Sequence, residues 1–165
     1  MSSTTHSKTI SIALTINGKL KHVEILPGER LSHMLRRQGY WGVKQGCYHG
    51  DCGTCSVLLN GRPIASCLKL AAQAHGAKIT TVEGLSVDGK PHALQDAFLD
   101  EGAAQCGFCT AGMLMSAKAL LARNPEPTEP QVREALAGNL CRCTGYEAPI
   151  RAVLQAAKAL KRNRR

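Results

Sequence analysis

Eight cysteines in two groups of four constrain this 165-residue chain more than any other feature. Their spacings are Cys47-x4-Cys52-x2-Cys55-x11-Cys67 and Cys106-x2-Cys109-x31-Cys141-x-Cys143. Residues 1–9 are polar and lack the apolar segment of a secretory leader, so we expect a cytoplasmic protein. Reducing compartments disfavour disulfides, and clustered thiols there usually bind metal or carry out redox chemistry.

The first group has, in its leading three cysteines, the spacing of a plant-type ferredoxin [2Fe-2S] site. Thiolates are soft ligands that favour iron-sulfur clusters, zinc or Cu(I) over hard cations. Structural zinc and buried inert thiols remain alternatives, although zinc sites usually pair two short knuckles. His49 lies in the same stretch, and we expect it to be exposed or supporting because four cysteines already complete a site. Three glycines allow the backbone to turn sharply around such a cluster: Gly46, Gly50 and Gly53.

The second group is less specific, because its Cys-Arg-Cys spacing is tight and its halves are far apart in the sequence. Taken alone, this spacing is as compatible with a four-cysteine zinc site that holds two helical hairpins together as it is with an iron-sulfur cluster. The first group tips the balance toward iron, because two clusters in one chain would form an electron relay.

The N-terminal half has the pattern of a small sheet with one helix. Two alternating segments flank Asn17-Gly18 and predict a type I′ hairpin with Ile10 opposite Ile25 and Ile12 opposite Val23. A helix is predicted across that face, with its apolar stripe at Leu31, Met34 and Leu35 and its end at Gly39. Further strands are expected at Ser56–Asn60, near Ile64 and at Ile79–Val82.

Beyond a polar, glycine- and proline-containing stretch at 83–91, the periodicity becomes helical. Four helices are predicted: His92–Leu99, Thr110–Arg123, one from a Thr128/Gln131 capping box to Gly138, and Ile150–Leu160. The fold class is therefore α+β. We expect a sheet-containing domain at 1–82, a linker at 83–91 and a helical domain at 92–165.

The formal charge of +9 invites a nucleic-acid interpretation, which the sequence does not favour. Basic residues are scattered, and three of the six aromatics lie within three residues of a cysteine instead of alternating with a basic stripe. No apolar run reaches the ~18 residues that a membrane span needs. We therefore expect neither a nucleic-acid partner nor a membrane span.

Three segments carry a resemblance to a known family: Gly46 to Cys55 (GCYHGDCGTC), Gln105 to Gly112 (QCGFCTAG) and Gly138 to Tyr146 (GNLCRCTGY). Together they resemble the iron-sulfur subunit of molybdenum hydroxylases, a family that includes xanthine dehydrogenase, aldehyde oxidoreductase and carbon monoxide dehydrogenase. The likeness extends from about Lys8 to Leu160 and includes all eight cysteines.

The resemblance implies an N-terminal ferredoxin-like β-grasp domain and a C-terminal four-helix bundle, each holding one [2Fe-2S] cluster. It also implies a large partner subunit that binds molybdopterin, a further subunit that binds FAD in some members, and a dimer of heterotrimers. Gln105 matches a glutamine that contacts the pterin, and Cys143 matches a ligand whose sulfur accepts a hydrogen bond from it. From the residues alone, a helix-end cap is the alternative role for Gln105.

The implied function is relay of single electrons from the molybdopterin centre to a flavin or another acceptor, with no catalytic residue in this chain. The rivals are a zinc-stapled module for binding nucleic acid or protein, and a free-standing ferredoxin. Arg142 is expected either to favour reduction of the nearby cluster or to form a surface salt bridge. Tyr40 and Trp41 depart from the family pattern, and we expect them to cover the core, with a subunit interface as the alternative.

Overall fold

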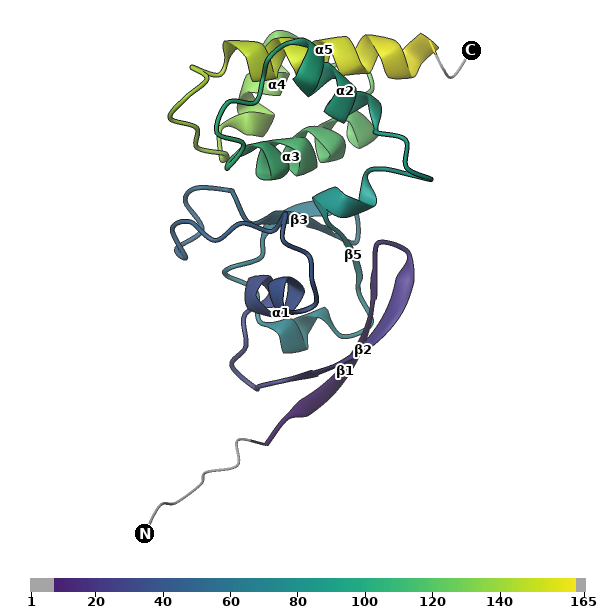
Figure 1. Ribbon diagram of the computed structural model, residues 1–165, viewed down its shortest axis with the longest axis vertical. Helices are drawn as coiled ribbons and strands as arrows, with labels where there is room; N and C mark the ends of the chain where they lie inside the picture. The colour runs from purple at the N-terminus through teal and green to yellow at the C-terminus, as the bar shows by residue number, and fades with distance from the viewer. Residues whose placement is uncertain (1–7, 163–165) are drawn as a thin grey trace.

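The computed structural model describes residues 8–162, and the segments 1–7 and 163–165 of the predicted domains lie outside the described residues. The described chain is a mixed α/β protein with one sheet and five α-helices, in agreement with the predicted class. The sheet half and the helical half are stacked end to end, with helix α3 facing strand β3 (Figure 1).

The sheet has the strand order β2-β1-β5-β3-β4, so β2 and β4 are its outer strands. Strand β1 pairs parallel with β5, and the other pairs are antiparallel. The strands are β1 (Ile10–Ile16), β2 (Lys19–Ile25), β3 (Ser56–Leu59), β4 (Arg62–Ala65) and β5 (Lys78–Thr80).

The predicted hairpin is confirmed together with its register. Ile10 lies opposite Ile25 and Ile12 opposite Val23. Asn17 and Gly18 have φ values of 49° and 81°, as a type I′ turn requires at both of its central residues.

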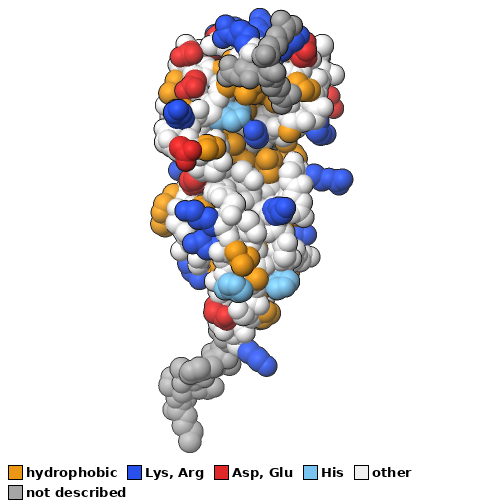
Figure 2. Space-filling model, turned by 90° about the vertical axis from the view of Figure 1, so that its right-hand side faces the viewer, with side chains coloured by type: hydrophobic (Ala, Val, Ile, Leu, Met, Phe, Trp, Pro, Cys, Tyr) orange, Lys and Arg blue, Asp and Glu red, His pale blue; other side chains and the backbone are white. Residues whose placement is uncertain are grey.

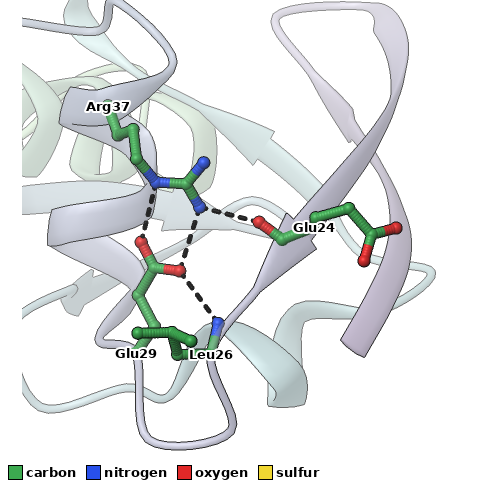
Figure 3. A network of polar contacts seen from close by, with 4 residues as sticks. All are labelled: Glu24, Leu26, Glu29 and Arg37. Atoms are coloured by element: carbon green, nitrogen blue, oxygen red, sulfur yellow. Dashed lines mark hydrogen bonds and ion pairs between the residues drawn. The ribbon is translucent and has the colours of Figure 1, made fainter. Parts of the chain in front are cut away.

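Helix α1 (Leu31–Arg37) packs its predicted apolar stripe into the core of the sheet half, and Gly39, with φ of 92°, follows its end. Arg37 fixes the connection between β2 and α1, as Figure 3 shows. Its Nε and Nη2 donate to the Glu29 carboxylate at 3.1 and 3.0 Å, and Nη2 also donates to the Glu24 carbonyl at 2.8 Å. The helix is thereby held at the end of the hairpin.

Four helices form the C-terminal half, each within three residues of its predicted bounds. Thr110–Arg123 matches the prediction, and the predicted capping box is present where Thr128 N donates to Gln131 Oε1 at 2.9 Å. A second hydrophobic core lies among these helices. The helices are α2 (Ala93–Asp100), α3 (Thr110–Arg123), α4 (Glu129–Leu136) and α5 (Glu147–Arg162).

The two halves are in close contact, and part of the predicted linker is packed. Leu58 of β3 and Leu85 belong to the core of the helical half. Thr81 and Asn17 exchange two hydrogen bonds of 2.9 Å just before a short 3₁₀ turn at Val82–Gly84. From Ser86 onward, every residue of the predicted linker is exposed.

The prediction that both neighbouring aromatics cover the core is wrong for Trp41. Tyr40 packs against the sheet-half core, whereas Trp41 is 60% exposed. The Arg36 guanidinium lies 4.9 Å from the centroid of the Trp41 ring, so a cation–π contact holds the indole on the surface.

Within residues 8–162, no helix is long and apolar enough to cross a membrane. Lys and Arg side chains are dispersed along the face shown in Figure 2 and form no continuous stripe there.

Candidate metal centre

The first four cysteines lie in one loop and one adjoining turn of the sheet half. Cys47, Cys52 and Cys55 occupy the loop before β3, and Cys67 follows β4. The loop is tightly coiled, because Gly50 and Gly53 have φ values of 89° and 65°. Cys55 and Cys67 are buried in the sheet-half core, whereas Cys47 and Cys52 are half-buried.

The second four cysteines come from two separate segments of the helical half. Cys106 and Cys109 lie in the loop that leads into α3, with Cys109 directly before the helix. Cys141 and Cys143 lie within the loop between α4 and α5. Cys109 is buried in the helical core, Cys141 is half-buried, and Cys106 and Cys143 are exposed.

Within each site the thiols associate in pairs. Cys47 N donates to Cys52 Sγ and Cys52 N donates to Cys47 Sγ, both at 3.4 Å. Cys106 Sγ and Cys143 Sγ lie 3.6 Å apart. The remaining thiols also interact in pairs, since beyond the larger effect of burial Cys55 raises the pKa of its neighbour Cys67 and Cys141 raises that of its neighbour Cys109.

This pairing bears on which metal the thiols fit. Among the described residues, no three Cys, His, Asp or Glu side chains converge on one metal position, as a mononuclear zinc site would require. A [2Fe-2S] core instead takes four thiolates, two on each iron. The donor set of each site, two adjacent pairs of thiols, therefore fits a two-iron cluster better than a single zinc ion.

The environment divides the thiols of each site into acidic and less acidic members. Backbone N–H groups of His49 and Cys52 lower the pKa of Cys47 to about 6, whereas burial raises that of Cys67 to about 11. Burial raises the pKa of Cys109 to about 12. Burial also raises the pKa of Cys141, but hydrogen bonds, the largest from the Thr144 side chain, outweigh it and bring the value to about 7. Each site thus has one thiol with a lowered pKa, which loses its proton more easily than its neighbours do, and the thiolate is the form that binds metal.

Residues beside the two cysteine sites hydrogen-bond to each other across the boundary between the halves. We call this contact, made by Cys52 and Gly53 with Asn139 and Leu140, the joint. Leu140 N, one residue before Cys141, donates to the Cys52 carbonyl at 2.9 Å. The amide of Asn139, 2% exposed, donates to the Gly53 carbonyl at 3.0 Å. A Cβ on Gly53 would lie 2.1 Å from the Gly138 carbonyl oxygen, and one on Gly112 would lie 2.2 Å from the Gly53 carbonyl oxygen. Only glycine at positions 53 and 112 permits this approach.

A surface hollow of about 650 Å³ lies among the cysteine-carrying segments of the two sites, and its lining comes from residues 46–54, 106–109 and 140–146. Cysteines of both groups line it, together with Phe108, Leu140 and Arg142. Phe108 and Leu140 are 46% and 54% exposed, so an apolar surface borders the cysteines. A hollow of similar volume between α2 and α5 contains no cysteine and is lined mainly by polar and charged side chains.

The other predicted residues are placed as follows. Gln105 is exposed in the loop beside Cys106, and it caps neither neighbouring helix, because Glu101 ends α2 and Cys109 begins α3. Arg142 is exposed beside the second site and takes part in none of the ion pairs among residues 8–162. His49 is exposed, as expected.

Sequence reasoning missed the polar residues that support the cysteines. Thr54 Oγ1 lies 3.3 Å from Cys52 Sγ, and Thr144 Oγ1 donates to Cys141 Sγ at 3.1 Å. Thr110, directly after Cys109, has a buried hydroxyl with no hydrogen-bond partner in the described part of the chain. Each threonine stands within three residues of a cysteine, and this proximity was the available signal. Asn139 gave no comparable signal, because its partner lies 86 residues away.

Comparison with known proteins agrees with this geometry. The 2Fe-2S iron-sulfur cluster binding domain matches residues 14–80, and the [2Fe-2S] binding domain matches residues 81–154. The nicotinate dehydrogenase small FeS subunit of Eubacterium barkeri is 49% identical over 138 residues, covering 83% of this chain and 88% of that protein. The xanthine dehydrogenase iron-sulfur-binding subunit of Escherichia coli O157:H7 is 49% identical over 155 residues, 93% of this chain and 98% of that one.

Among solved structures, quinoline 2-oxidoreductase from Pseudomonas putida 86 contains a chain with a TM-score of 0.91 and 50% identity. The match covers 94% of this chain and 98% of that one. Sequence, domain composition and fold therefore agree over nearly the whole length, and the chain belongs to the family of iron-sulfur subunits of molybdenum hydroxylases, the family of xanthine dehydrogenase and aldehyde oxidoreductase.

Proposed function

We propose that this chain relays single electrons through two [2Fe-2S] clusters, from a molybdopterin centre in a large partner subunit to a flavin or another acceptor. The observation that carries the proposal is the arrangement of eight thiols as two sites of two pairs, joined by the hydrogen bond from Leu140 N to the Cys52 carbonyl. A diffusible ferredoxin would not require a second site at such a joint.

The proposed ligands of the N-terminal cluster are Cys47, Cys52, Cys55 and Cys67, and those of the C-terminal cluster are Cys106, Cys109, Cys141 and Cys143. When bound, such clusters supply one-electron carriers whose potentials depend on hydrogen bonds, burial and nearby charge. The protein contributes buried faces at Cys55, Cys67 and Cys109, which exclude water from one side of each site. No residue of this chain is proposed to act on substrate.

We assign the exposed side of the C-terminal site to the large subunit. Gln105, Cys106 and Cys143 are all exposed there, so a pterin in a partner subunit could reach them without rearrangement of the core. Gln105 would then contact the pterin, and Cys143 Sγ would accept a hydrogen bond from it. Exposed Arg142 adds positive charge at the same edge and would favour the reduced cluster.

The finer organisation is part of the same proposal. It comprises a β-grasp domain at 1–82, a linker at 83–91 and a four-helix bundle at 92–165. The separate hydrophobic cores of the two halves support this division. A dimer of heterotrimers with a flavin subunit, in the cytoplasm, is the assembly expected from the resemblance.

The test is to purify the chain anaerobically from a host that builds iron-sulfur clusters, with its neighbouring gene products co-expressed. We expect about four irons and about four acid-labile sulfides per chain, as two [2Fe-2S] clusters require, with two distinct electron paramagnetic resonance signals on reduction. A much larger molybdenum-containing chain should co-purify. Bound zinc without visible absorbance would contradict the proposal, and a well-folded chain with clusters but no large partner would favour a free-standing ferredoxin.

A further inference from the structure

In each site, one threonine hydroxyl lies within hydrogen-bonding distance of one cysteine sulfur. Thr144 Oγ1 donates to Cys141 Sγ at 3.1 Å, and Thr54 Oγ1 lies 3.3 Å from Cys52 Sγ. Thr54 is 3% exposed, and Thr144 is half-buried, so water competes weakly for either hydroxyl. The two contacts come from different sequence spacings, two residues in one site and three in the other.

The direction of both hydrogen bonds is fixed once the sulfur is a ligand. A free Cys52 thiol could donate to Thr54 or accept from it. A metal-bound thiolate has no hydrogen, so only the hydroxyl can donate. A hydrogen bond to an ionised acceptor is stronger than one between neutral groups, so both contacts would strengthen when a cluster is present.

The local backbone makes room for the Thr54 contact. A Cβ on Gly46 would lie 3.0 Å from Cys52 Sγ and 3.1 Å from Thr54 Oγ1, so a larger residue there would press on both atoms. The absence of a side chain at position 46 leaves the hydroxyl and the sulfur free to approach.

The two sulfurs belong to cysteines whose backbone lies at the contact between the halves. The Cys52 carbonyl accepts from Leu140 N at 2.9 Å, and Leu140 directly precedes Cys141. Each hydroxyl therefore acts on a cysteine that is itself in, or next to a residue in, the hydrogen-bonded contact between the halves. Reduction adds one negative charge to a cluster, and a donor aimed at its ligand sulfur stabilises that charge.

We propose, resting on the function proposed above, that Thr54 and Thr144 are positioning residues that raise the reduction potentials of the N-terminal and C-terminal clusters through the sulfurs of Cys52 and Cys141. The effect of each threonine is confined to its own cluster, because each hydroxyl contacts a single ligand.

The test uses the full assembled complex and a redox titration that follows the resonance signal of each cluster separately. In Thr144→Val, which keeps the side-chain shape but lacks the hydroxyl, the equilibrium constant for reduction of the C-terminal cluster should fall about tenfold, a shift of about 59 mV for one electron. The N-terminal cluster should keep its potential. Thr54→Val should give the reverse pattern.

Serine keeps the hydroxyl, so Thr144→Ser and Thr54→Ser should restore most of each shift. Thr15→Val, in β1 and outside both cysteine loops, is the matched control and should move neither potential. Fully loaded valine variants with unchanged potentials would overturn this inference while leaving the relay intact. A wild-type complex without clusters would instead overturn the relay itself.

If a valine variant does not load its cluster, resonance Raman spectra of the wild-type and serine proteins decide. Exchange into D₂O should shift the iron–cysteine stretching bands of both, because the hydroxyl proton is exchangeable. Bands that are insensitive to deuterium would overturn the inference.

Discussion

The two cysteine sites differ in how the chain builds them. The N-terminal site takes three of its four cysteines from the single loop 47–55, and its buried members lie in the sheet-half core. The C-terminal site draws on two loops separated by the whole of α3 and α4, and two of its four thiols are exposed. A site made by one loop is encoded in local spacing, whereas a site made by two segments exists only when the helices pack. The four predictions below test that contrast.

The largest expected effect comes from removing one buried ligand in each site. Cys109→Ser should eliminate the C-terminal cluster and lower the iron content from about four to about two per chain, while the N-terminal resonance signal persists. Cys67→Ser should give the opposite pattern. In the assembled enzyme, Cys109→Ser should impair electron flow from substrate more than Cys67→Ser impairs reduction of the molybdenum centre.

Iron and sulfide analysis, resonance spectra and single-turnover reduction measure these outcomes. Loss of both signals in either variant would show that the two sites do not assemble independently.

The second prediction concerns the joint. Gly53→Ala places a Cβ 2.1 Å from the Gly138 carbonyl at a φ of 65°, so the loops must separate, and we expect a loss of about 3 kcal/mol or more in unfolding free energy. Gly61→Ala is the matched control: its φ is 80°, but nothing lies within 4 Å, so only the cost of the left-handed conformation, about 1 kcal/mol, is expected. Denaturant unfolding of both variants provides the comparison, and equal losses would argue against a tight joint.

Asn139 provides a milder test of the same joint. Asn139→Ala removes the amide donor from the buried Gly53 carbonyl, which keeps its hydrogen bonds from Ser56 N and Oγ, so we expect a cost of about 1 kcal/mol, that of one hydrogen bond. Because this bond joins the two halves, calorimetry should also show broader or separated transitions. The control Asn124→Ala removes exposed hydrogen bonds within the helical half alone. A single sharp transition in both variants would mean that the halves do not depend on Asn139 for cooperative unfolding.

The smallest expected effect is a pH dependence confined to the helical half. His92 Nδ1 accepts from Leu94 N at the start of α2, and burial, followed by the charge of Lys118, lowers the His92 pKa. The folded protein therefore favours neutral His92, whereas the histidine of the unfolded chain takes up a proton near pH 6.5. The contribution of His92 to the unfolding free energy is complete above that pH and is lost as the pH falls toward and through the lowered pKa. We expect a loss of about 0.5 kcal/mol, at the low end for helix caps because His92 is half-exposed.

His92→Asn, which can cap without titrating, should flatten this dependence in unfolding measured between pH 5 and pH 8. Replacement of exposed His22 by Gln should leave it unchanged. A steeper loss at low pH in His92→Asn would contradict the assignment.

Much of the fold could be predicted because its signals are local. The Asn17-Gly18 turn fixed the hairpin register, and the apolar periodicity of Thr110–Arg123 located α3 to the residue. Cysteine spacing likewise identified the candidate ligands of the N-terminal site. The pairing of Cys109 with Cys141 depends on how α3 packs against α4, and the contact of Asn139 with Gly53 depends on how the helical half packs against the sheet half. No local sequence pattern predicts either packing. The exposure of Trp41 was missed for a related reason, since Arg36 offers the indole a favourable partner outside the core.

The outer strands of the sheet have a consequence for the newly made chain. Strand β2 carries Lys19, Lys21 and Glu24, and β4 contains Pro63, which has no N–H to offer. Edge strands that carry charged side chains, or that lack a backbone N–H to donate, pair poorly with a strand from another molecule. Newly made chains are thereby protected against edge-to-edge aggregation in the interval before metal is inserted, while their thiols are still uncoordinated.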